Sequence, residues 1–375
     1  MRKEEIRGLI IYSILILAAV IVGLTVIRDS MANYGPNKMS DFGFIIIVLL
    51  IAYLFNAFGL EFLHVLGAII GGYSVTSFNV LSLCFYKTEE KWKFGFRDFN
   101  GICGETKIAP KKEKTNINMF TWLPLFGFAI ELAACVVIST IVKTNTLPKH
   151  PWLRSAAIIF ILISSMIAFY NLVPFKLDAM TDGFRIRLFT KEINVKAYNE
   201  MLVVKEEQRI GKSTGKIPVF DEITDFTAEI NILAMYQFLE SENYDEARNI
   251  LDKLIDNKKV LNIDDYNRLL AQKIYLEILT KPIDEARKLY DELCSADIRR
   301  FIANDSSMQS IRAYVLIAGM IEGSESEVEY AKSKVERAKK RTLASQIATE
   351  EKLLTKALDY VYENHPKWVK EKAAE

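Results

Sequence analysis

The chain has 375 residues, of which half are hydrophobic and a quarter charged, and its net charge is +1. The hydrophobic residues gather in four segments with almost no charge, namely residues 9–27, 42–73, 117–142 and 155–175. Because about 20 apolar helical residues span a bilayer core, this distribution excludes a simple soluble enzyme, a disordered chain and a secreted disulfide scaffold. The four cysteines form no CxxC pair, so we expect neither a disulfide framework nor a zinc ribbon.

The small net charge hides a difference between the two halves of the chain. Residues 1–190 hold 19 Lys and Arg against 13 Asp and Glu, whereas the remainder holds 29 against 34. The sequence therefore predicts a slightly basic membrane half followed by an acidic, water-soluble half. Neither half concentrates the basic charge that nucleic-acid binding needs, so we expect no nucleic-acid partner.

The first apolar segment, residues 9–27, is long for a signal peptide and is predicted to be a retained anchor. Residues 74–116 carry eight Lys and Arg, whereas residues 28–41 carry two and residues 143–154 carry three. Because basic loops stay in the cytoplasm, we expect about four transmembrane helices in a bacterial plasma membrane, with both termini cytoplasmic.

The long basic loop is predicted to contain a β-hairpin. Residues 75–86 are rich in β-branched and aromatic side chains, and residues 91–99 alternate charged with aromatic ones. The apolar face of this hairpin would lie against the membrane or in the cleft between the helices. An amphipathic surface loop is the alternative.

Two ionisable side chains interrupt the second apolar segment. Glu61 and His64 are three residues apart, on one face of a helix. They match the last part of the H-E-x-x-H motif, in which two histidines bind zinc and the glutamate activates a water. Ionisable groups inside a membrane helix are costly and indicate a functional site.

A second polar group follows the fourth apolar segment. Pro174 ends that helix, and Asn171 can bond the backbone group that the proline frees. The pair Asp182-Gly183 is expected on a turn near the cytoplasmic end. Because the second helix also runs inward, Asp182 can meet Glu61 and His64 at similar depth. Solvated carboxylates at a helix end are the alternative interpretation.

The order of these features resembles the site-2 protease family of intramembrane zinc metalloproteases, over residues 42–190. The resemblance implies that His64 and Asp182 are zinc ligands and that Glu61 is the general base. It also implies that Asn171 and Pro174, in N-x-x-P, lie beside the substrate, with the Gly183 of D-G nearby. The strand-rich loop is similar to the one that presents the substrate as an added strand in that family.

Leu60 departs from the family pattern, because it stands where the first zinc-binding histidine is expected. A catalytic zinc usually has three protein ligands and a water, and His64 and Asp182 supply two. Asp178 or Glu131 could add an oxygen ligand, although Glu131 is better explained as a helix-packing hydrogen bond. Zinc is therefore expected to bind weakly or not at all.

Residues 226–375 are predicted to be entirely helical. The segments around Ala247 and Ala286 repeat the pattern D-E-A-R after 39 residues, and a weaker copy around Ala331 follows 45 residues later. This spacing resembles a tetratricopeptide-like array of helical hairpins, with a generic helical bundle as the alternative. We expect a domain of residues 1–189, a linker of residues 190–225 with a short helix near 195–204, and a repeat domain of residues 226–375.

The sequence thus favours a mainly α-helical protein with a polytopic membrane core and a cytoplasmic helical domain. The first functional hypothesis is a zinc-deficient pseudoprotease that binds a transmembrane or signal-derived peptide, while the helical domain docks a cytoplasmic or membrane partner. The alternative is an active intramembrane metalloprotease with Glu61 as its base. A third possibility is a structural membrane anchor for the helical domain.

Overall fold

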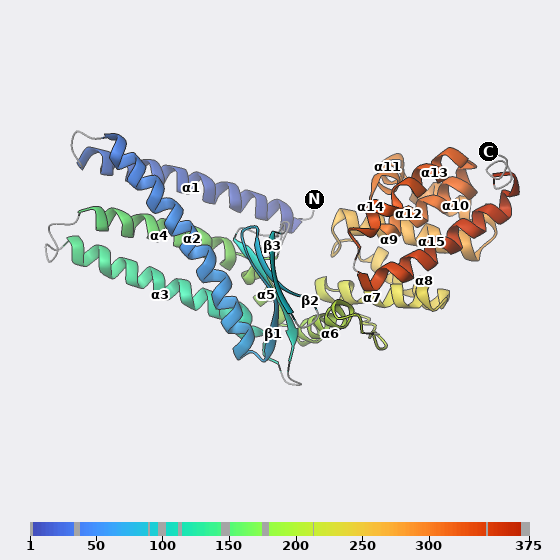
Figure 1. Cartoon of the computed structure of the whole chain (residues 1–375), viewed down its shortest axis with the longest axis horizontal. Coiled ribbons are helices and arrows are strands. Elements are labelled where there is room, and N and C mark those ends of the chain that lie inside the picture. Colours follow the sequence, from blue (N-terminus) through green and yellow to red (C-terminus); the bar gives the residue numbers. More distant parts are fainter. Residues whose placement is uncertain are drawn as a thin grey trace. The chain divides into compact units, whose positions relative to one another are not determined.

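The computed structural model describes residues 3–33, 38–88, 91–96, 103–111, 115–143, 151–174, 180–212, 214–342 and 344–368. The chain is mainly helical, with one antiparallel sheet, and divides into two compact units, Met1–Val195 and Lys196–Glu375 (Figure 1). We call them the N-terminal unit and the C-terminal unit. Their boundary falls inside the segment that the sequence predicted as a linker.

Four long helices form most of the N-terminal unit: α1 (Lys3–Asn33), α2 (Lys38–Ile70), α3 (Ile117–Lys143) and α4 (Pro151–Leu172). In the described part of the chain, three helices are long and apolar enough to cross a membrane, over Gly8–Thr25, Gly43–Ile70 and Ile117–Ile138. The apolar stretch of α4, Ala156–Leu172, is shorter. Many large apolar side chains of α1, α2 and α3 point outward, as a lipid-facing surface requires.

Small residues allow α2 and α3 to pack closely. A Cβ atom at Gly67 would lie 2.4 Å from the Met119 carbonyl oxygen, and one at Gly127 would lie 2.1 Å from Leu63 Cδ1. Close approach at glycines is typical of helices in membranes, because packing contacts replace the hydrophobic driving force there. This contact places the side of α2 that carries His64 against α3, where His64 bonds the Phe120 carbonyl.

The sheet contains four strands, β1 (Tyr73–Val80), β2 (Leu83–Thr88), β3 (Lys91–Phe96) and β4 (Gly104–Pro110), in the order β3-β2-β1-β4. The β2–β3 pair lies where the hairpin was expected. Residues 75–86 are not one strand, because the chain turns at Leu81, whose φ is 52°. Strand β4 was not predicted. Strands β1 and β4 pack against α2, so the sheet covers the end of that helix.

Two shorter helices follow α4, namely α5 (Asp182–Phe189) and α6 (Glu192–Arg209). Asp182 was predicted on a turn, and it is instead the first residue of α5. Thr181 explains the difference, because its Oγ1 accepts a hydrogen bond from the Phe184 amide and donates one to the Val173 carbonyl at 2.8 Å. Helix α6 is longer than the helix predicted near 195–204.

The C-terminal unit is a stack of helices. It contains α7 (Asp225–Glu240), α8 (Tyr244–Asp256), α9 (Ile263–Thr280), α10 (Ile283–Leu293), α11 (Ala296–Asn304), α12 (Met308–Leu316), the π-helical turn η1 (Ile317–Glu322), α13 (Glu325–Ser333), α14 (Val335–Lys339) and α15 (Ala344–Asn364). Helix α7 packs on α8, α8 on α9, and α9 on both α10 and α12, while α15 packs on α12. The regular elements in the described part of residues 226–375 are all helical, as the sequence predicted.

Candidate functional site

The structure brings together the three residues that carry the predicted site. Glu61 and His64 lie on α2, and Asp182 lies at the start of α5. Their exposed fractions are 3%, 5% and 2%, respectively. Three ionisable groups thus share one interior position, and each needs polar partners to offset the loss of water.

His64 is held on both sides of its ring. Its Nδ1–H donates to the Phe120 carbonyl at 2.9 Å, and its Nε2 lies 3.3 Å from Asp182 Oδ2. A carbonyl oxygen only accepts, so Nδ1 carries a proton. Asp182 Oδ2 receives no directed hydrogen bond from the described residues. A proton shared between Nε2 and Oδ2, or a metal ion bound by both, would satisfy the two atoms.

The His64–Asp182 pair meets one geometric requirement of zinc. Two ligand atoms about 2.0–2.1 Å from a tetrahedral zinc lie about 3.3–3.4 Å apart, and Nε2 and Oδ2 are separated by 3.3 Å. The Nδ1 bond to a backbone carbonyl is also the outer-shell contact that orients a metal-binding histidine. These two residues fit half of a zinc site.

The remaining ligand position does not fit zinc. Leu60 is 3% exposed and packs in an apolar cluster with Ala57, Val80, Cys103, Phe128 and Ile167. Within the described ranges, no group of three or more His, Cys, Asp or Glu side chains is placed to hold a metal ion. Among the described residues, His64 and Asp182 therefore supply two of the three protein ligands that a catalytic zinc usually has.

Glu61 is held by the sheet rather than by α2 alone. Thr106 Oγ1 donates to Glu61 Oε2 at 2.6 Å. A Cβ atom at Gly104 would lie 3.0 Å from Glu61 Cγ and 2.1 Å from the Asn79 carbonyl oxygen. Strand β4 thus reaches the carboxylate because residue 104 has no side chain. Sequence reasoning missed both residues, since it did not predict β4.

Arg185 is a further charged neighbour that sequence reasoning missed. Its Nη1 lies 3.5 Å from Asp182 Oδ1, one helical turn along α5. The spacing of three residues in Asp182-Gly-Phe-Arg185 was the available indication, because residues three apart share a helix face. Arg185 adds positive charge beside the position where a cation would lie, which weakens metal binding further.

The residues of the N-x-x-P and D-G elements have different roles. Asn171 Nδ2 donates to the Ile167 carbonyl at 3.1 Å, within α4. Pro174 is exposed. Gly183 does bear on the site, because a Cβ atom there would lie 1.8 Å from the Leu172 carbonyl oxygen. The end of α4 therefore sets the position of Asp182.

Glu131 has the helix-packing role that the sequence favoured. Its Oε1 accepts hydrogen bonds from Asn56 Nδ2 at 3.2 Å and from Ser164 Oγ at 2.6 Å. These bonds join α2, α3 and α4. Asp178, the other candidate oxygen ligand, lies outside the described residues.

Comparisons with protein-family models, with curated proteins and with solved structures returned no match.

Proposed function

We propose that the N-terminal unit is a membrane core of the site-2 protease type that binds a transmembrane or signal-derived peptide without cutting it. The C-terminal unit, as a tetratricopeptide-like array, docks a cytoplasmic or membrane partner, since stacked helical hairpins usually bind peptides on an extended face. The protein would lie in a bacterial plasma membrane with both termini in the cytoplasm. Three apolar helices long enough to cross a bilayer support the membrane assignment.

One observation carries the proposal. Glu61, His64 and Asp182 converge in a buried position, while Leu60 fills the first ligand position with an apolar side chain. Buried ionisable groups in a membrane helix are expensive, so their convergence favours a binding role over a structural one. The leucine lowers zinc affinity, because catalytic sites need three protein ligands.

An active zinc metalloprotease with Glu61 as its base is the second candidate. The 3.3 Å separation of His64 Nε2 and Asp182 Oδ2 favours it, because this is a zinc ligand-to-ligand distance. When bound, zinc would lower the pKa of its water and so supply a nucleophile for attack on a peptide bond. The chain's own residues would hold His64 and Asp182 in place through the Phe120 carbonyl and Gly183.

The substitution Leu60→His distinguishes the two candidates. We expect the wild-type protein to purify without stoichiometric zinc and to leave a reporter transmembrane peptide intact. Leu60→His should then bind about one zinc per chain, because it restores the third ligand. Elemental analysis and a cleavage assay measure these properties. Phe62→His is the matched control, because Phe62 is two residues away and 56% exposed.

The outcomes separate the hypotheses. Zinc near one per chain in the wild type, lost in His64→Ala and accompanied by cleavage, would establish the protease instead. Binding of a fluorescent transmembrane peptide in nanodiscs should fall at least tenfold in Asp182→Ala if the peptide binds at Glu61, His64 and Asp182. Unchanged peptide binding in both Asp182→Ala and Glu61→Ala would leave only a membrane anchor.

A further inference from the structure

An extended segment in the C-terminal unit is bound along α7. Residues 215–220, which we call the strap, have no regular secondary structure and precede α7 in the chain. They run back along the helix, because residue 217 lies beside Gln237 and residue 220 beside Asn231. The strap belongs to the segment predicted as a linker, and its binding to α7 was not foreseen.

Two side-chain amides of α7 bind the main chain of the strap. Asn231 Oδ1 accepts from the Phe220 amide at 2.8 Å, and Asn231 Nδ2 donates to the Phe220 carbonyl at 2.8 Å. Gln237 Oε1 accepts from the Ile217 amide at 2.9 Å, and Gln237 Nε2 donates to the Gly215 carbonyl at 2.7 Å. Each amide thus satisfies one donor and one acceptor of an extended chain, as a neighbouring strand would.

The spacing of the two amides matches an extended peptide. Asn231 and Gln237 are six residues apart, which is about 9 Å along a helix. Ile217 and Phe220 are three residues apart, which is about 10 Å along an extended chain. Pro218 favours this conformation, because it lacks an amide hydrogen and restricts the preceding residue to extended geometry.

Side chains of the strap add specificity to this main-chain recognition. Ile217 and Phe220 are buried, with exposed fractions of 4% and 8%, whereas Val219 between them is 41% exposed. Asp221 is the residue directly after the strap, and its Oδ1 lies 2.7 Å from Lys253 Nζ of α8. The bound pattern is therefore an aliphatic residue, an aromatic residue three positions later, and an acidic residue directly after it.

We propose that Asn231 and Gln237 of α7, with Lys253 of α8, form a peptide-binding site that the chain's own strap occupies. A partner protein would present an extended segment with the same aliphatic, aromatic and acidic pattern and replace the strap. This proposal rests on the docking role of the C-terminal unit and does not involve the Glu61 site. The tethered strap competes at an effective concentration in the millimolar range, so a partner peptide binds the closed form weakly.

The test uses the full chain in nanodiscs and a fluorescent synthetic peptide with the sequence of residues 214–223. The double substitution Ile217→Asp/Phe220→Asp expels the strap and leaves α7 intact. We expect it to bind the peptide at least tenfold more tightly than the wild type does, by fluorescence anisotropy. The control peptide carries the same two aspartates and should bind neither protein. Circular dichroism verifies that the variant is folded.

A milder variant covers the case in which the double substitution unfolds the unit. Pro218→Gly gives the unbound strap more conformational freedom and leaves the sequence of α7 unchanged. We expect this variant to bind the peptide about two to five times more tightly than the wild type does. If a folded strap variant binds the peptide no better than the wild type does, the strap is a fixed part of the fold and the proposal is wrong. Binding of the transmembrane peptide to the Glu61 site is measured separately and would be unaffected by that result.

Discussion

At the scale of single residues, Leu60 is the residue at which the Glu61 site departs from the pattern H-E-x-x-H. His64 bonds the Phe120 backbone carbonyl, and Glu61 accepts a hydrogen bond from the Thr106 hydroxyl. Leu60 instead joins a packed apolar cluster. A histidine at position 60 would bring a polar ring into that cluster. This is unfavourable unless binding of a metal ion offsets the lost hydration of the ring.

Gly183 offers a direct test of how Asp182 is positioned. In Gly183→Ala the new Cβ atom would lie 1.8 Å from the Leu172 carbonyl oxygen, so α5 must move away from α4. We expect a loss of about 1–3 kcal/mol of stability, as for other overpacked sites, and a loss of transmembrane-peptide binding. Thermal unfolding in detergent and nanodisc binding measure the two effects.

The matched control for this substitution is Gly59→Ala. A Cβ atom at Gly59 meets nothing within 4 Å, although Gly59 lies on α2 two residues from Glu61. Alanine should therefore be tolerated there or be slightly stabilising, because it is the better helix former. Equal effects of the two substitutions would show that the contact between α4 and α5 does not position Asp182.

At the scale of elements, Glu131 joins three helices inside the membrane core. Glu131→Ala removes the acceptor of Asn56 and Ser164. Hydrogen bonds between membrane helices contribute about 0.6 kcal/mol each, so we expect a loss of about 1–2 kcal/mol in detergent unfolding. Glu131→Gln keeps an acceptor oxygen and should retain most of the stability. A similar loss in both variants would mean that the charge matters rather than the bonds.

The elements that were predicted correctly have strong local patterns. The long helices follow from uncharged apolar segments, and the C-terminal helices follow from their periodicity. Strand β4 was missed because its seven residues include Glu105 and Lys107, and its pairing with β1 joins residues about 30 positions apart. Helix α11 was covered only by the general helical prediction for residues 226–375, although Ser295 caps it and Ile298, Phe301 and Ile302 follow a helical period.

In the candidate site, too, some residues could be predicted from the sequence and others could not. Glu61, His64 and Asp182 were identifiable because ionisable residues are rare in apolar segments. Thr106 and the Phe120 carbonyl were not, because their contacts depend on strand register and helix packing. The strap had a similar obstacle: its glycine and proline predicted a loop, but Asn231 and Gln237, which bind it, lie 11 to 22 positions from their partners.

At the scale of the whole molecule, buried polar groups have different roles in the two units. In the N-terminal unit Glu61, His64 and Asp182 converge on one site, besides the Glu131 bonds that join three helices, whereas in the C-terminal unit buried polar groups join helices to each other. Arg312 is fully buried, pairs with Glu350 and bonds Gln272 at 2.6 Å, so it connects α9, α12 and α15. A buried ion pair is weak evidence for stability but removing one partner is costly, which indicates a structural role.

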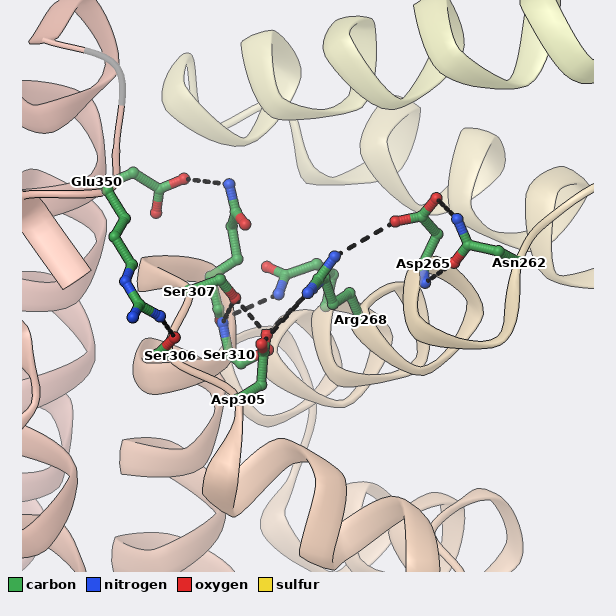
Figure 2. A network of polar contacts seen from close by, with 11 residues as sticks. Asn262, Asp265, Arg268, Asp305, Ser306, Ser307, Ser310 and Glu350 are labelled. Atoms are coloured by element: carbon green, nitrogen blue, oxygen red, sulfur yellow. Dashed lines mark hydrogen bonds and ion pairs between the residues drawn. The ribbon is translucent and has the colours of Figure 1, made fainter. Parts of the chain in front are cut away.

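Asp305 belongs to a second polar network, from which we expect the C-terminal unit to lose stability in acid. Figure 2 shows Arg268 between Asp265 and Asp305, with Ser307 and Ser310 beside Asp305. Burial raises the pKa of Asp305, but the bonds from Arg268, Ser307 and Ser310 and the Arg268 charge outweigh it and lower the pKa to about 2. The folded state therefore favours the ionised carboxylate.

A lowered pKa contributes stability that is present above the unfolded value of 3.8 and is lost as the pH falls toward 2. The difference corresponds to about 2 kcal/mol at neutral pH. We expect Asp305→Asn to be less stable than the wild type by this amount at pH 7. The two free energies of unfolding should approach each other between pH 4 and pH 2. Urea unfolding of the full chain, followed through Trp368 with the other three tryptophans replaced by Phe, measures it. Asp297→Asn is the control, because the Asp297 side chain is 92% exposed and 3.6 Å from Arg300. If the difference in the free energy of unfolding between wild type and Asp305→Asn stays constant with pH, the charge of the carboxylate contributes nothing to stability.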